Sequence, residues 1–165
     1  MTAREHSQAK LVVCGGRNSA EFEKLSEQLG IAERVKFLGF VDDIHQVFLG
    51  CDAFVLPTFY DPCSLVVPEA MHYGMPVVTT AQNGAAELMT HGRDGFVISE
   101  PWNLNELSAA LGRLCDDPQL RARLGAEARR RAERFTMQAR LKELTDVLEQ
   151  CGRTDYSRPP QRRAA

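Results

Sequence analysis

Two carboxylates, eight residues apart, mark the stretch of this 165-residue chain that is most suited to chemistry. Asp61 follows an apolar run that ends near Leu56, and Glu69 lies in a segment with helical spacing that continues to Met71. An ionised carboxylate accepts hydrogen bonds and donates none, so two of them suit a neutral ligand rich in hydroxyl groups. Taken alone, a single Glu in a helix is usually just solvated.

The residues between the two carboxylates predict the start of a helix over 64–73. Pro68 lacks an N–H group and is tolerated in the first turn of a helix, which places the helix start at Ser64 or Leu65. The backbone N–H groups of Cys63–Val67 are then free to bind an anion, for which diphosphate is the obvious candidate. The alternative is that Ser64 merely caps the helix, and capping does not exclude anion binding.

Five short apolar runs predict the strands that position this stretch. They alternate with segments of helical spacing, which predicts an α/β fold with an open parallel sheet covered by helices on both faces. The expected strands cover residues 11–14, 35–38, 53–56, 76–79 and 96–98. Ligands of such sheets bind beyond the carboxyl ends of the strands, where residues 60–71 fall.

The expected helices begin at polar residues that can cap them. Ser19 caps the first, Asp42 or Asp43 the second, and Thr136 the last, whose apolar side carries Leu141, Leu144, Val147 and Leu148. A short helix is expected at 85–89, and a longer helical region begins at Asn103. One domain over 11–150 is expected, between a polar segment at 1–10 and a disordered Arg- and Pro-containing tail at 151–165.

The composition excludes several classes of function. A formal net charge of −2 argues against broad nucleic-acid binding, which needs a concentrated basic face. No apolar run approaches the roughly 18–20 residues that span a membrane, and the polar first ten residues hold no signal-peptide core, so a cytoplasmic location is expected. Five scattered cysteines indicate reduced thiols. Cys63 stands at a helix start, where thiol pKa values can fall, but a packing or loop role is favoured over nucleophilic catalysis.

Several ordered blocks resemble the donor-binding, C-terminal half of the retaining family 4 glycosyltransferases, the "glycosyl transferases group 1", which have two Rossmann-like domains. The signature Glu-x7-Glu followed by Ala-Met-Ala-x-Gly-x-Pro-Val-Val is matched by Asp61-x7-Glu69-Ala70-Met71-His72-Tyr73-Gly74-Met75-Pro76-Val77-Val78. Supporting blocks lie at 11–16, 35–41, 51–58, 83–88 and 92–97. The resemblance spans about residues 11–150. The sequence of residues 60–67 is similar to that of a subgroup related to the lipopolysaccharide core glucosyltransferases.

The resemblance implies transfer of a hexosyl group from a nucleotide sugar, with UDP-hexose as the donor and no cofactor or metal. It implies that Glu69 binds the ribose hydroxyls. Asp61 replaces the family's first Glu, which contacts the donor sugar, and it keeps the charge with a shorter reach. The implied donor-binding set is Gly39, Phe40 and Val41 beside the base, with Cys63, Ser64, Leu65 and Val66 at the diphosphate and sugar.

Two parts of the family pattern have no counterpart here. The family's donor domain opens with a strand followed by Gly-Arg and Lys-Gly, whose cations neutralise the leaving diphosphate. Without that strand, the strands at 11–14 and 53–56 are expected to be unpaired or forced into a new neighbour relation, each edge an aggregation hazard. The acceptor-binding half is also absent. We therefore expect a fragment, a truncated gene product or a split chain that is a poor enzyme alone.

Three hypotheses follow for the chain in isolation. The first is the donor-binding part of an enzyme, whose partner is a separate acceptor-binding domain or chain; that missing half could also make a peripheral membrane contact. The second is a non-catalytic nucleotide-sugar-binding module, or a subunit of a split glycosyltransferase. The third is a relic that keeps the fold but binds no ligand.

Overall fold

The computed structural model describes residues 6, 8–16, 19–135 and 137–153. The chain divides into two compact units, residues 1–132 and 133–165, each of which is described by itself. The first unit contains every strand and the expected site, so it carries the functional argument.

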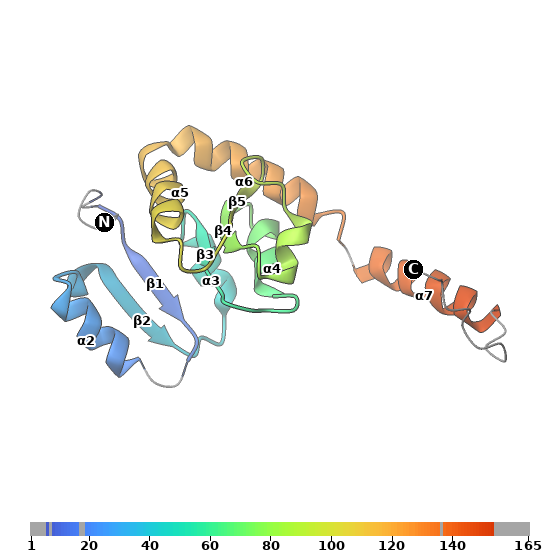
Figure 1. Ribbon diagram of the computed structural model, residues 1–165, viewed down its shortest axis with the longest axis horizontal. Helices are drawn as coiled ribbons and strands as arrows, with labels where there is room; N and C mark the ends of the chain where they lie inside the picture. Colours follow the sequence, from blue (N-terminus) through green and yellow to red (C-terminus); the bar gives the residue numbers. More distant parts are fainter. Residues whose placement is uncertain (1–5, 7, 17–18, 136, 154–165) are drawn as a thin grey trace, which may run out of the picture. The chain divides into compact units, whose positions relative to one another are not determined.

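The strands of the first unit form two parallel sheets (Figure 1). One sheet pairs β1 (Leu11–Cys14) with β2 (Val35–Gly39). The other has the order β3 (Phe54–Leu56), β4 (Val77–Thr80), β5 (Gly95–Ile98). The predicted α/β class and all five predicted strands are confirmed, with ends that shift by one residue.

Strand β4 is the buried centre of the larger sheet, and all four of its residues are buried. Its last two residues are threonines, whose hydroxyls need partners in such a place. The Thr79 hydroxyl donates to the Leu56 carbonyl oxygen at 2.8 Å, and the Thr80 hydroxyl donates to the Thr58 carbonyl oxygen at 2.6 Å. These bonds fasten the carboxyl end of β4 to the segment that leads out of β3.

Helices and two 3-10 turns connect the strands and cover them. The first unit contains α2 (Ala20–Gln28), η1 (Ala32–Arg34), α3 (Ile44–Leu49), α4 (Val66–His72), η2 (Gly84–Leu88), α5 (Leu104–Asp116) and α6 (Pro118–Ala132). The short helix expected at 85–89 is the 3-10 turn η2.

The expected caps are only partly confirmed. Asp43 caps α3, since its carboxylate accepts a hydrogen bond from the His45 N–H. Ser19 occupies the N-cap position of α2 without a capping bond, because its hydroxyl donates to the Glu23 carboxylate at 2.5 Å instead. Thr136 lies outside the described residues.

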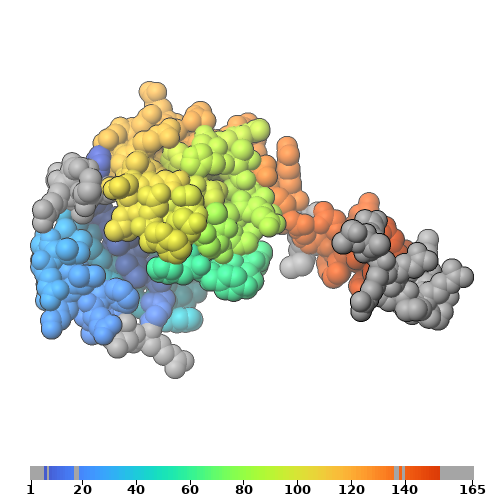
Figure 2. Space-filling model, viewed as in Figure 1, coloured from blue at the N-terminus to red at the C-terminus, as the bar shows by residue number. Residues whose placement is uncertain are grey.

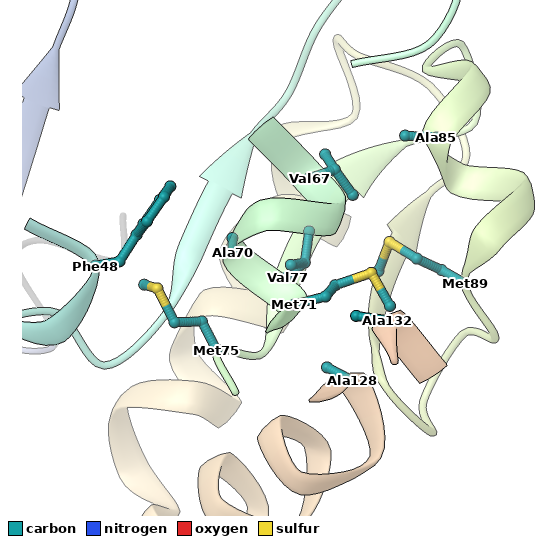
Figure 3. Close-up of a cluster of buried hydrophobic side chains, with 10 residues drawn as sticks. All are labelled: Phe48, Val67, Ala70, Met71, Met75, Val77, Ala85, Met89, Ala128 and Ala132. Atoms are coloured by element: carbon teal, nitrogen blue, oxygen red, sulfur yellow. The ribbon is translucent and has the colours of Figure 1, made fainter. Parts of the chain in front are cut away.

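Two apolar clusters form the core, one on each side of β4. The first holds Met71 of α4, Met89, and Ala128 and Ala132 of α6 (Figure 3). Helices α4 and α6 come close at two glycines: Gly74, with φ +73°, turns the chain after α4 and lies against Gly125 of α6. The second cluster packs β4 and β5 against α5 and α6.

The strands form two separate sheets, and the break lies between β1 and β3. β1 pairs with β2 only and β3 pairs with β4 only, so in the part of the chain that the structure describes no ladder joins β1 to β3. Neither of the two expected outcomes, unpaired strands or a new neighbour relation, is seen among the described residues: β1 and β3 each keep one paired neighbour and have one open edge.

The second unit contains α7 (Met137–Arg153). The expected apolar residues are present and exposed within this unit; they are Leu141, Leu144, Val147 and Leu148. The tail boundary expected at 151 is wrong, because Cys151, Gly152 and Arg153 continue the helix; residues 154–165 lie outside the described part. Among the described helices none is long and apolar enough to cross a membrane.

Candidate functional site

Asp61 lies in the loop that leaves the carboxyl end of β3, and the loop after β4 holds it in place. Its backbone N–H donates to the Gln82 carbonyl oxygen at 3.2 Å, and its carbonyl oxygen accepts from the Gly84 N–H at 2.8 Å. One carboxylate oxygen accepts from the Cys63 N–H at 3.1 Å. The other has no hydrogen-bond partner among the described residues and is available to a ligand.

Asn83 is the residue that joins this loop to the sheet. The residue is only 1% exposed. Its amide oxygen accepts from the N–H groups of Ser64 (3.4 Å) and Ala85 (3.0 Å), and its amide nitrogen donates to the Thr79 hydroxyl at 3.0 Å. From the sequence alone, Asn83-Gly84 predicts a turn and nothing more. The signal that could have revealed more is an Asn placed directly after a strand, at the edge where ligands bind.

Fewer backbone N–H groups are free at the start of α4 than expected. Those of Cys63 and Ser64 are used by Asp61 and Asn83. The helix runs over Val66–His72, shorter than the expected 64–73, and Leu65 is its N-cap with no side-chain capping bond. The interpretation of Ser64 as a helix cap is therefore wrong. The remaining candidates for an anion are the N–H groups of Leu65 and Val66, since the first N–H groups of a helix have no acceptor within it and Val67 is fully buried.

Glu69 projects from the solvent side of α4. Its neighbours Val67, Ala70 and Met71 are fully buried, whereas Glu69 is exposed. Within the described ranges, its carboxylate makes no hydrogen bond or ion pair. Pro68 lies in the first turn, as predicted. An unpaired acid above an otherwise buried helix face is free to accept hydrogen bonds from a ligand.

The stretch Gly39–Val41 lies at the carboxyl end of β2, in the smaller sheet. Gly39 adopts a positive φ of +64°, and its carbonyl oxygen accepts from the Gly15 N–H at 2.6 Å. Phe40 is 84% exposed. No hydrogen bond between described residues joins this turn to the Asp61 loop, so the structure brings together Asp61, Cys63 and Ser64 but does not tie Gly39–Val41 to them.

Hydrogen bonds join the loop at the carboxyl end of β4 to the loop at the carboxyl end of β5. The side-chain amide of Gln82 donates to the Ser99 carbonyl oxygen at 3.3 Å and to the Glu100 carboxylate at 3.1 Å. The hydroxyl and N–H of Ser99 donate to the Glu106 carboxylate at 2.6 and 3.0 Å. These hydrogen bonds, the Ser99 hydroxyl first, lower the pKa of Glu106 below its ordinary 4.5. One chain of contacts therefore runs from α5 to Asp61.

Glu106→Gln is expected to lower the free energy of unfolding by about 1 kcal/mol at most at pH 7, since the bonds are open to solvent. The pKa of Glu106 is lower in the folded state, so its contribution is complete above pH 4.5 and is lost as the pH falls through the folded-state value. Urea unfolding from pH 3 to 7 measures the difference. Glu33→Gln, at the exposed residue of the η1 turn, is the control; an equal and pH-independent effect of both changes would contradict the prediction.

The other reactive side chains do not join the site. Burial raises the pKa of the Cys14, Cys51 and Cys115 thiols, which makes them poor nucleophiles. Cys63 is exposed, and its backbone, not its thiol, takes part in the loop. Glu87 is exposed on η2.

Comparison with known proteins gives a family. The model of the family described as "Glycosyl transferases group 1" matches residues 1–131. A glycosyltransferase of Methanocaldococcus jannaschii is 34% identical over 116 residues, which are 68% of this chain and 30% of that protein. The lipopolysaccharide glucosyltransferase WaaG of Escherichia coli is 28% identical over 84% of this chain and 37% of its own length.

A solved structure with a nucleotide is also similar. HepE of Anabaena in complex with UDP has a TM-score of 0.80 and 30% identity, over 87% of this chain and 41% of that one. The chain thus spans between 30% and 41% of the length of these three proteins.

Proposed function

Because the chain belongs to the group 1 glycosyltransferases, we propose that it binds the nucleotide-sugar donor of a retaining hexosyl transfer. The observation that carries the proposal is the Glu69 carboxylate, which is exposed and has no partner among the described residues. It lies on α4, whose first N–H groups are the remaining candidates for a diphosphate. A ribose diol could donate two hydrogen bonds to such a carboxylate.

The Asp61 loop supplies the second contact of the proposed site. Its backbone is fixed by Gln82 and Gly84, so the free carboxylate oxygen is held in place before a ligand arrives. We assign this oxygen to the hydroxyls of the donor sugar. The N–H groups of Leu65 and Val66 face the diphosphate in this proposal, with Cys63 and Ser64 as backbone supports. The turn Gly39–Val41 borders the base, where exposed Phe40 offers a ring for stacking.

The proposed donor is a UDP-hexose. HepE, which is similar to this chain, has also been solved with UDP-glucose, at a TM-score of 0.77 and 30% identity. We further propose that no metal is needed, since hydrogen-bond donors of the protein face the diphosphate. Binding is then expected to be the same in EDTA and in magnesium, and a requirement for magnesium would contradict this part.

Glu69→Ala is expected to weaken UDP binding about tenfold or more, because two hydrogen bonds to a charged group are lost. Isothermal titration calorimetry of the full chain with UDP measures the change. Glu21→Ala, in the first turn of α2, removes an exposed acid from a helix outside the site and is the matched control. Equal affinity of the Glu69→Ala variant and the wild-type chain would rule out the ribose contact.

A second function, binding without transfer, is favoured by a specific observation. Between Lys36 and Arg93 the sequence contains no Lys or Arg, so the whole stretch that carries Asp61 and Glu69 lacks a cation for the leaving diphosphate. Charge stabilisation of that kind is usually the largest catalytic contribution. We propose that transfer requires a separate acceptor-binding domain or chain, in the cytoplasm. Release of UDP from UDP-glucose by this chain alone would contradict the binding-only function.

A further inference from the structure

The loop after β5 presents the only tryptophan of the chain to solvent. Trp102 is 67% exposed, although tryptophan is on average a highly buried residue. In the loop after β3, Phe59 and Tyr60 are also exposed, at 71% and 78%. Within the described ranges, neither the Tyr60 hydroxyl nor the Trp102 indole N–H has a hydrogen-bond partner. Three exposed aromatic side chains on loops at one edge of a sheet indicate a binding surface.

Hydrogen bonds join these two loops through the loop after β4. The Asp61 N–H donates to the Gln82 carbonyl oxygen at 3.2 Å, and the Gln82 side chain donates to the Glu100 carboxylate at 3.1 Å. Tyr60 directly precedes this row of residues, and Trp102 lies two positions after it. In Figure 2 the yellow atoms of α5 and the loop before it lie beside the blue-green atoms of the Asp61 loop. Two strand spacings put the ends of the row about 10 Å apart.

The backbone holds both ends of this row in place. The Thr58 hydroxyl donates to the Tyr60 carbonyl oxygen at 3.2 Å. The Trp102 carbonyl oxygen accepts from the Leu104 N–H at 2.9 Å, and the preceding Pro101 is buried. An aromatic side chain has only two rotatable bonds, so a ring on a fixed turn loses little conformational entropy when a ligand covers it. The two rings therefore suit a ligand that has an apolar face.

The loops that carry the rings contain acids and no cations. The sequence has no Lys or Arg between Lys36 and Arg93, and none from Asp94 to Gly112. A phosphate, a sulfate or a sugar acid would therefore meet like charges on these loops and no counter-charge. The negative face of an aromatic ring attracts C–H groups, and carboxylate oxygens accept hydrogen bonds from hydroxyls. A neutral saccharide offers both, with C–H groups on the face of each sugar ring and hydroxyls around its rim.

We propose that the row from Tyr60 to Trp102 binds a neutral oligosaccharide. The two rings stack on two of its sugar rings, and the length of the row exceeds one sugar ring. Between them, the second carboxylate oxygen of Glu100 has no partner among the described residues and accepts from a sugar hydroxyl. Trp102 lies two strands away from the loop of Asp61, so this site is additional to the proposed donor site.

The fluorescence of the full chain tests the proposal directly, because Trp102 is the only tryptophan. The probes are maltohexaose and cellohexaose, two neutral glucose hexamers that differ in linkage, titrated without nucleotide. A sugar ring on the indole is expected to shift the emission to shorter wavelengths and to lower the acrylamide quenching constant at least about twofold. A heparin hexasaccharide, which is strongly anionic, is expected to change neither quantity.

Tyr60→Ala keeps the fluorescent reporter and is expected to weaken oligosaccharide binding about fivefold or more. Phe22→Ala, which removes a 61% exposed ring from α2 outside this surface, is the matched control and is expected to bind as the wild-type chain does. Far-ultraviolet circular dichroism checks that both variants are folded. Unchanged affinity of the Tyr60→Ala variant would overturn the proposal.

Three further results would also overturn it. No response to either glucose hexamer would assign the surface to a protein partner, and an equal response to the heparin hexasaccharide would exclude a site for neutral sugars. Protection from acrylamide that grows with protein concentration in the absence of sugar would assign the surface to a second copy of the chain. None of these measurements involves a nucleotide, so failure here is separate from failure of the proposed donor site.

Discussion

Gly84→Ala is expected to weaken UDP binding by about tenfold to a hundredfold, because it displaces the loop that holds Asp61. A Cβ at position 84 would overlap the carbonyl oxygen of Pro62 and would lie 2.7 Å from its carbonyl carbon. Both are backbone atoms that cannot rotate away, so the two loops must move apart. The Gly84 N–H then loses its bond to the Asp61 carbonyl oxygen. Overpacking of this kind is also expected to cost about 1–3 kcal/mol of stability.

Calorimetric titration with UDP and urea unfolding together measure this result. Gly50→Ala is the matched control: its Cβ would meet its nearest atom, the Gln46 carbonyl oxygen, at an ordinary 3.4 Å, and its backbone has a negative φ. The control is expected to bind UDP as the wild-type chain does. Wild-type affinity in the Gly84→Ala variant would show that the Asp61 loop takes no part in binding.

Gly125→Ala is expected to destabilise the first unit by about 3 kcal/mol, although alanine has the higher helix propensity. Its Cβ would overlap the Gly74 carbonyl oxygen and would lie 3.0 Å from the carbonyl carbon. Gly74 cannot easily yield, because its φ of +73° ends α4 at this point. The helix that carries Glu69 must then move away from α6, so weaker UDP binding is expected as well.

Urea unfolding followed by circular dichroism tests this prediction. Gly112→Ala makes the same change in the middle of α5, where the Cβ would approach only the end of the His6 side chain, at 3.2 Å. That side chain can turn aside, so this control is expected to be neutral or slightly stabilising. The prediction fails if the two variants unfold with their midpoints at the same urea concentration.

The strands could be predicted from the sequence because each is a short apolar run closed by a turn residue. Their ends could not, because the partner strand sets them. Pro76 was expected to open the fourth strand, but it has no N–H group for the ladder, and β4 begins at Val77. The Pro76 carbonyl oxygen still accepts from the Phe54 N–H, so the residue borders the sheet without belonging to it.

The candidate site was predictable in its position but not in its hydrogen bonds. Apolar spacing and Pro68 predicted a helix start between Asp61 and Glu69, and the structure has α4 there. The cap at Ser64 failed because α4 begins at Val66 with Leu65 as its N-cap, and the Ser64 N–H bonds instead to Asn83, which lies 19 residues further along the chain. The spacing of neighbouring residues in the sequence cannot show a contact between two loops that are far apart along the chain. For the same reason Asn83 was interpreted as a turn residue, and the Glu106–Ser99–Gln82 chain of contacts was not foreseen.

The environment of Asn83 also affects how readily this residue is deamidated. In an Asn-Gly pair, the glycine nitrogen attacks the asparagine side-chain carbonyl carbon, a succinimide forms and ammonia leaves. Here the Gly84 N–H is bonded to Asp61, and the Asn83 amide is held by Ser64, Ala85 and Thr79, so the folded chain keeps the two groups apart. In an unfolded chain the attack is open. Water then opens the succinimide to aspartate or isoaspartate. Neither product has the donor for Thr79, and each places a new negative charge beside the proposed diphosphate site. Deamidation while unfolded is therefore expected to damage the proposed site in the refolded chain.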